Sequence, residues 1–96
     1  MSTVHIELLP VGSVIFPKGG NSLIVIIGIG HRATDDGAVY DYAGVPYPIG
    51  YINPNSVYLF NNDDIERVFS MGYVNEEQLA FDGQIRQAIE EARQES

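Results

Sequence analysis

A glycine pattern of the kind that cradles a dinucleotide, GxGxxA, spans residues 28–33 directly after an apolar run. Such a loop works only when a helix follows at once, within a parallel βαβ unit, so that the helix N-terminus receives the pyrophosphate. The residues after Ala33 lead to the turn pair Asp36-Gly37 and predict no amphipathic helix. We therefore interpret Gly28 and Gly30 as residues that bend a strand end, and we expect no nucleotide cofactor.

Two pairs of neighbouring carboxylates could serve acid–base chemistry or bind a hard cation. Asp35 and Asp36 precede a glycine turn, whereas Asp63 and Asp64 follow Asn61, which can cap a single helical turn. Adjacent side chains on a strand or a turn point in different directions. Turn formation and capping therefore explain both pairs better than catalysis or cation binding does.

The remaining candidates for chemistry are histidine and serine side chains. His5 and His31 have no metal-ligand neighbour at helical or hairpin spacing, and Ser13 lies in no nucleophile motif. We expect no metal site, no catalytic residue and no enzymatic activity.

The tyrosines are more informative, because tyrosine combines a large apolar contact area with a polar tip. The chain has 6 tyrosines and 4 phenylalanines. Four of the tyrosines fall close together and are our candidates for contact with a partner: Tyr40, Tyr42, Tyr47 and Tyr51. The same property suits a half-buried sheet face equally well, so the composition leaves both interpretations open.

The charge balance argues against two classes of partner. Thirteen acidic and five basic residues give a formal net charge of −8, so we expect neither nucleic acid nor a membrane as partner. Solubility explains an acidic surface, and a basic face on another protein is the alternative. The chain has no cysteine, no signal-peptide pattern and no apolar run near the ~20 residues that span a bilayer. These features favour a cytoplasmic protein.

Two β-forming runs, Ser13–Phe16 and Leu23–Ile29, flank a turn that contains proline and glycine, and they predict a hairpin. The second run is continuously apolar, which is typical of a central strand covered on both faces. A third strand, Ala38–Tyr42, follows the Asp-Gly turn. Three prolines in residues 43–55 argue against a central strand there and predict an ordered crossing.

Two further short strands, Ser56–Phe60 and Arg67–Met71, precede a helix that the sequence predicts over residues 75–94. Asn75 is an apt N-cap residue for this helix. Apolar residues recur at helical spacing and form one stripe: Phe81, Ile85, Ala88, Ile89 and Ala92. Acidic residues near the C-terminal end, where the helix dipole is negative, predict fraying of the last turn.

These elements predict one domain over residues 1–96 with an α+β fold. A small curled antiparallel sheet of four or five strands is accompanied by one C-terminal helix. A partly open barrel of the SH3-like kind is one form that such a sheet can take. Residues 1–10 form a lead-in or an edge strand. An exposed edge can add a strand from a partner or from a second copy, so the sequence is compatible with a homo-oligomer.

Several short motifs occur in the order found in a known family, and the likeness runs from about Leu8 to Phe81. The motifs are Leu9–Val14, Lys18–Gly20, Ile24–Gly30, Tyr40–Gly50, Phe60–Val68 and Gly72–Glu77. On these residues the chain resembles a family of small Gram-positive bacterial proteins of unknown function. That family is encoded beside type VII secretion genes and their LXG toxins.

The resemblance implies a cytoplasmic accessory protein that binds a toxin before export, as an adaptor, chaperone or targeting factor. It supplies no catalytic residue. An immunity protein that neutralises a neighbouring toxin is the alternative, and a small ligand-binding barrel or enzyme is a third. The sequence thus predicts a non-enzymatic interaction protein whose partner is another protein, with a secreted toxin as the leading candidate.

Overall fold

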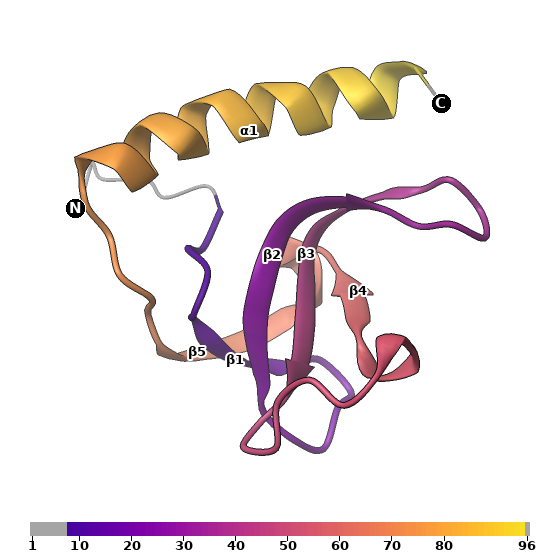
Figure 1. Cartoon of the computed structure of the whole chain (residues 1–96), viewed down its shortest axis with the longest axis vertical. Helices are drawn as coiled ribbons and strands as arrows, with labels where there is room; N and C mark the ends of the chain where they lie inside the picture. The colour runs from indigo at the N-terminus through magenta and orange to yellow at the C-terminus, as the bar shows by residue number, and fades with distance from the viewer. Residues whose placement is uncertain (1–7, 96) are drawn as a thin grey trace.

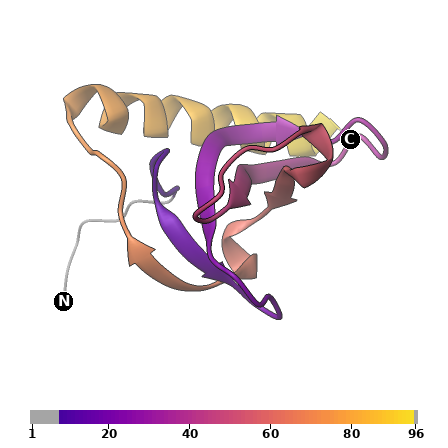
Figure 2. The same cartoon turned by 60° about the horizontal axis from the view of Figure 1, so that its bottom comes forward.

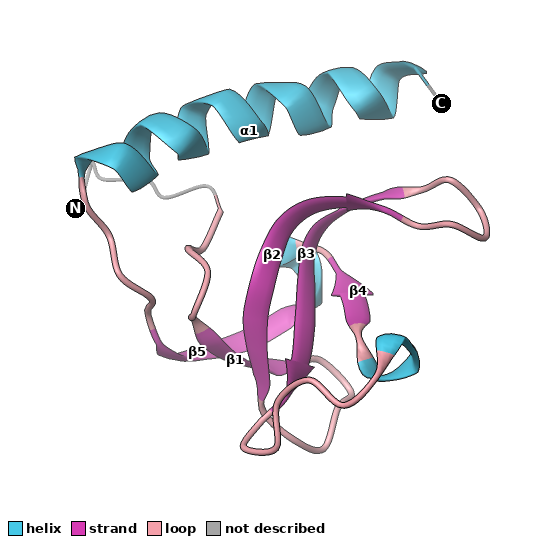
Figure 3. Cartoon of the chain, viewed as in Figure 1, coloured by secondary structure: helices cyan, strands magenta, loops and turns pink. Residues whose placement is uncertain are grey.

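A computed structural model describes residues 8–95 of the chain, which form one antiparallel sheet and one long helix (Figure 1). The strands are β1 (Val14–Pro17), β2 (Ile24–Arg32), β3 (Val39–Pro46), β4 (Tyr58–Phe60) and β5 (Ile65–Ser70). Two short 3-10 helices, η1 (Pro54–Ser56) and η2 (Asn62–Asp64), flank β4, and α1 (Glu76–Glu95) follows β5 (Figure 3). The α+β class, the antiparallel sheet and the C-terminal helix are confirmed. Residues 1–7 of the predicted lead-in lie outside the described residues, and Leu8 to Pro10 form no strand.

The sheet has the strand order β4-β3-β2-β1-β5, with every neighbouring pair antiparallel. Its two edge strands, β4 and β5, follow each other in the chain and are joined through η2. The long strands β2 and β3 bend strongly, so the sheet is curled (Figure 2). The edges do not pair with each other, and the sheet is therefore open and not closed into a barrel.

β3 is longer than the sequence predicts, and this corrects the interpretation of residues 43–55. The strand runs on through Ala43, Gly44 and Val45 to Pro46, paired with β2 on one side and β4 on the other. Proline blocks strand pairing only where its missing N–H is needed. The three residues before Pro46 contain no proline, so pairing continues up to it.

β2 is the middle strand of the sheet, as predicted, but it is not covered on both faces. Ile24 and Ile26 are buried, whereas the next residue, Ile27, is exposed. The pairing with β3 shifts register between Ile26 and Gly28, so this glycine segment contains an irregularity of the bulge type. An uninterrupted apolar run therefore marks a central strand here without showing that both faces are buried.

The helix α1 lies across one end of the sheet and contacts β2 and β3 (Figure 1). Gly30 allows the close approach: a Cβ atom there would lie 3.2 Å from Ile85 Cδ1 and 3.3 Å from Ile89 Cγ1. The predicted stripe is too wide, because Phe81 and Ala88 are exposed. The predicted N-cap is confirmed, since Asn75 Oδ1 accepts the Gln78 N–H at 2.9 Å.

The core is small and contains side chains from the sheet, from α1 and from the segment before β1. Tyr42 and Phe60 pack ring against ring with their centroids 5.3 Å apart. The buried apolar cluster consists of Leu8, Ile15, Ile24, Ile26, Tyr42, Phe60 and Ile89. Among the described residues, no helix combines the length and apolarity needed to cross a membrane.

Gly44 provides a test of the packing between β3 and its neighbours. A Cβ atom there would lie 2.4 Å from Ile24 Cγ2 and 3.0 Å from both Phe60 Cε1 and the Val25 carbonyl oxygen. Both side chains are buried, so Gly44→Ala should lower the free energy of unfolding by about 1–3 kcal/mol. Urea denaturation measures this loss.

Gly83→Ala is the matched control, because Gly83 is exposed on α1 and a Cβ atom there meets nothing within 4 Å. It should raise the free energy of unfolding by about 1 kcal/mol through helix propensity. A loss of stability in both variants, or in neither, would contradict the packing described for Gly44.

Candidate functional site

The four tyrosines that the sequence singles out do not form one surface. Tyr42 is 0% exposed and lies in the core, and Tyr40 on the same strand is half-buried. Tyr47 and Tyr51 lie in the loop after β3 and are exposed. Of the four, only Tyr47 and Tyr51 are exposed. The sequence could not separate the two pairs, because tyrosine suits both positions.

The loop of residues 47–52 carries a dense group of exposed apolar side chains. Tyr47, Ile49, Tyr51 and Ile52 are between 51% and 68% exposed. We call these four residues the 47–52 surface.

The backbone of this loop is held at both ends. The Tyr47 N–H donates to the Leu23 carbonyl at 3.0 Å and the Gly50 N–H donates to the Pro46 carbonyl at 2.7 Å. At the far end, Ser56 Oγ accepts the N–H groups of Ile52 and Asn53 at 3.3 and 3.2 Å. The apolar side chains are thus displayed on an ordered backbone.

A cavity of about 280 Å³ lies between the β1–β2 turn and β4. It is lined by Pro17, Gly20, Asn21, Ser22, Ile24, Tyr58 and Phe60. The 47–52 loop begins beside it, because Tyr47 bonds to Leu23, the residue between two members of the lining. Tyr58 on the edge strand is itself exposed. The cavity thus lies between the start of the 47–52 loop and the sheet edge at Tyr58.

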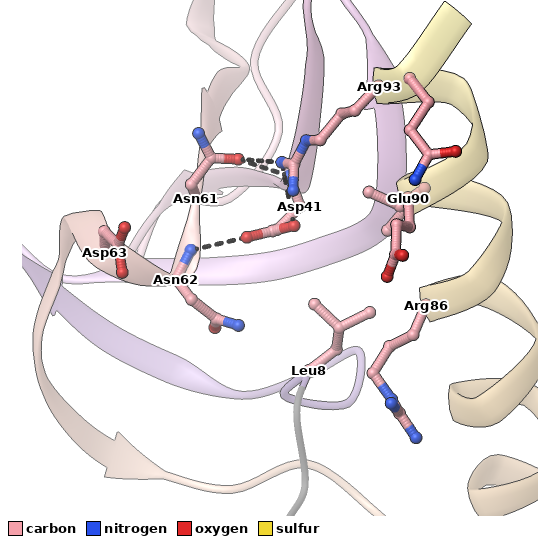
Figure 4. Close-up of a pocket in the computed structure, with 10 residues that line it drawn as sticks. Leu8, Asp41, Asn61, Asn62, Asp63, Arg86, Glu90 and Arg93 are labelled. Carbon is pink, nitrogen blue, oxygen red and sulfur yellow. Dashed lines mark hydrogen bonds and ion pairs between the residues drawn. The ribbon is translucent and has the colours of Figure 1, made fainter.

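A larger and more polar groove of about 730 Å³ separates α1 from η2 (Figure 4). Carboxylates and guanidinium groups both line it, from Asp41, Asp63, Glu90, Arg86 and Arg93. The buried side chain of Leu8 also lines the groove.

Asp41 is the centre of a hydrogen-bond network at the groove. The residue is buried, and Arg93 Nη2 donates to its Oδ1 at 3.1 Å while the Asn62 N–H donates to its Oδ2 at 2.9 Å. The Asp41 N–H donates to Asn61 Oδ1 at 2.9 Å, and Arg93 donates to the same oxygen at 2.8 Å. Both carboxylate oxygens are therefore engaged in holding α1 and η2 against β3.

Arg93 is the residue that sequence reasoning missed. It also donates to the Val39 carbonyl from Nε and Nη2, at 3.2 and 3.1 Å. The last turn of α1 is helical as far as Glu95, and Arg93 in that turn anchors it to β3, which opposes the predicted fraying. Its position near the negative end of the helix dipole was the only signal in the sequence.

The other candidate groups take structural roles. Asp35 Oδ1 accepts the Asp36 N–H at 2.7 Å and Asp36 Oδ1 accepts the Ala38 N–H at 2.9 Å, both within the β2–β3 turn. Asp64 Oδ2 accepts the Asn61 N–H at 2.9 Å at the start of η2. In the described part of the chain, no three His, Cys, Asp or Glu side chains gather as a metal site.

The Tyr42 hydroxyl completes the polar arrangement inside the core. It accepts the Leu9 N–H at 2.8 Å and donates to Asn62 Oδ1. Burial raises the pKa of Tyr42 from 10.0 to about 12, and the nearby carboxylates of Asp41 and Asp82 add to the rise. This tyrosine is a structural residue that fixes the segment before β1.

Arg93→Ala should lower the free energy of unfolding by about 1–2 kcal/mol, because Asp41 stays buried without its charged donor. The loss stays below that of a fully buried ion pair, since the Arg93 side chain is itself 43% exposed. Urea denaturation measures the effect, and Gln87→Ala on the exposed face of α1 is the control. Equal stability of the two variants would contradict the anchoring role.

Tyr42→Phe tests the buried hydroxyl through its pH dependence. The raised pKa means that the folded protein holds this proton more tightly than the unfolded chain, whose tyrosine titrates near 10. The corresponding stability is complete below about pH 10 and is lost as the pH rises toward about 12. Unfolding at about pH 9 and about pH 11 should show a larger loss in the wild type than in Tyr42→Phe.

At neutral pH, Tyr42→Phe should itself be less stable by about 1–2 kcal/mol, because the Leu9 N–H loses its acceptor. An identical loss of stability between the two pH values in both proteins would contradict the assignment.

Comparison with known proteins places this fold in a family. The model of a domain of unknown function, DUF4176, matches residues 8–81. The matched range contains all five described strands and the first part of α1. The chain has no match among curated proteins or among solved structures. Because the match covers most of the sequence, the chain belongs to the DUF4176 family of domains of unknown function.

Proposed function

We propose that the protein is a non-enzymatic interaction protein that binds another protein through the 47–52 surface. The observation that carries this proposal is the exposure of four large apolar side chains, between 51% and 68%, on one short loop. Exposed apolar groups scattered singly are ordinary, but a concentrated patch is typical of a contact site. Two of the four are tyrosines, which are enriched at protein interfaces.

The hydrogen-bonded backbone of this loop favours binding. A partner that contacts a loose loop must also order it, and this costs free energy. Here the N–H groups of Tyr47 and Gly50 donate to backbone carbonyls, and Ser56 Oγ accepts two further N–H groups at the far end of the loop. The exposed side chains can therefore be covered at a smaller entropic cost.

The adjoining cavity suits an apolar side chain of the partner. Interface residues that contribute most to affinity are commonly aromatic or aliphatic groups seated in such a hollow. The net charge of −8 favours a partner with basic residues around its contact face, because complementary charges speed association and suppress wrong partners.

We further propose that the partner is an LXG-type toxin of a type VII secretion system, which the protein binds before export as an adaptor, chaperone or targeting factor. This step rests on the resemblance set out above. An apolar, tyrosine-bearing surface on an acidic domain suits the task of covering another protein's contact face.

Co-purification with the toxin encoded next to it tests the proposal. The double variant Tyr47→Ala and Tyr51→Ala should weaken binding by roughly 2 kcal/mol or more, about thirtyfold in Kd, if these rings are anchors of the interface. Both rings are exposed, so the variant should fold normally. Tyr73→Ala is the matched control, because Tyr73 is 80% exposed on the segment between β5 and α1.

Absence of association, or an equal loss of binding in the Tyr73→Ala control, would contradict the proposal. Export and toxicity assays separate the roles. An adaptor should be needed for export of the toxin, whereas protection of the cell with export unchanged would identify an immunity protein.

A further inference from the structure

The end of the sheet that carries the 47–52 surface is uncharged. Its residues come from two stretches, 19–30 and 42–60, and neither stretch contains Asp, Glu, Lys, Arg or His. All 13 acidic residues therefore lie outside both stretches. The turn between β1 and β2 and the 47–52 loop lie together at this end, away from α1 (Figure 1). The net charge of −8 thus belongs to the rest of the molecule.

The cavity beside this surface has room for one side chain. Pro17 and Ile24 line it from the ends of β1 and β2, and Tyr58 and Phe60 line it from β4. Phe60 is 6% exposed and Tyr58 is 49% exposed, so the hollow reaches from the edge of the core to the protein surface. Its volume of about 280 Å³ is below the roughly 300–1,000 Å³ of sites for drug-sized ligands. A single side chain is therefore a better occupant than a cofactor.

The lining decides which kind of side chain can enter. A charged group that leaves water needs an opposite charge or several hydrogen bonds in return. The described residues that line the cavity include no charged side chain. Lys18 follows Pro17 in the chain, but it is exposed and is not part of the lining. An apolar side chain is therefore favoured over a charged one.

Two polar side chains of the lining favour a peptide as the molecule that supplies it. Asn21 and Ser22 line the cavity and are exposed. A side-chain amide and a hydroxyl each donate and accept hydrogen bonds, and they match the N–H and C=O groups of an incoming backbone. Binding sites combine an apolar lining with a few placed polar groups in this way. The hydrocarbon of a bilayer offers no such groups to these two side chains.

We propose that the cavity and the 47–52 surface together bind an uncharged peptide segment of the partner, with one apolar side chain of that segment seated between β4 and the β1–β2 turn. This inference rests on the proposed function and specifies the part of the partner that makes the contact. Basic residues of the partner, which the net charge of −8 attracts, lie around this contact and not within it.

A titration with N-acetyl-leucine N-methylamide, followed by NMR of the isotope-labelled full chain, tests the cavity without the partner. The compound carries one apolar side chain between two peptide groups. Amide signals of residues 20–24 and 58–60 should shift, with a Kd on the order of millimolar for a fragment of this size. The corresponding lysine compound should shift them several-fold less. Equal shifts with both compounds, or no shift at these residues, would overturn the proposal.

Ser22→Glu is the matching variant, because it adds a carboxylate to the lining of the cavity. It should remove most of the shift caused by the leucine compound and weaken binding of the neighbouring toxin by about tenfold or more. Thr34→Glu makes the same change of charge on the exposed turn between β2 and β3, and it should leave both measurements unchanged. Urea denaturation should show that the two variants are equally stable, since both positions are exposed.

This inference and the proposed function fail in different ways. If the double variant Tyr47→Ala and Tyr51→Ala weakens toxin binding but Ser22→Glu does not, the proposed function stands and this inference is overturned. If the leucine compound binds in the cavity and the toxin does not bind at all, this inference is supported and the toxin is excluded as the partner. Sedimentation with phosphatidylcholine vesicles that Ser22→Glu abolishes would assign this end to a membrane and overturn the inference.

Discussion

Two adjacent buried polar residues on β3, Asp41 and Tyr42, hold the rest of the structure together. A buried carboxylate and a buried hydroxyl are tolerated only when they are hydrogen-bonded. Asp41 satisfies this requirement with Arg93 of α1 and the Asn62 N–H of η2, and Tyr42 with Leu9 and Asn62. The helix, the turn between the two edge strands and the segment before β1 are thereby fixed to one point on the sheet.

The small size of the domain explains why many apolar side chains lie on its surface. The polar network and a small cluster of side chains fix one end of the sheet, where α1 lies (Figure 1). A domain of 96 residues has a high ratio of surface to volume and covers only part of its apolar area. Part of the uncovered area lies on the 47–52 surface, where four large apolar side chains are exposed on one short loop.

Much of the fold followed from local patterns. The first hairpin, the turn at Gly37, the strand at the centre of the sheet and the N-cap at Asn75 depend on residues close together in the sequence, and the structure has all of them. The errors arose where distant contacts decide. The prolines after Val45 give no sign that β3 runs on to Pro46, because its pairing partners on β2 and β4 lie elsewhere in the chain. The partners of Arg93 likewise lie 32 to 54 residues away, so local sequence does not show that this side chain anchors α1 to β3.

The sequence by itself determined the class of the fold, the acidic charge, the family likeness and the tyrosine-rich stretch that contains the exposed loop. Only the tertiary structure decided which tyrosines are available. Tyr42 is enclosed between neighbouring strands and α1, whereas Tyr47 and Tyr51 lie beyond Pro46, where the chain leaves the sheet. The physical reason is that one side chain type satisfies a core and an interface equally well. Burial therefore depends on which distant segments pack over it, and local sequence does not encode that.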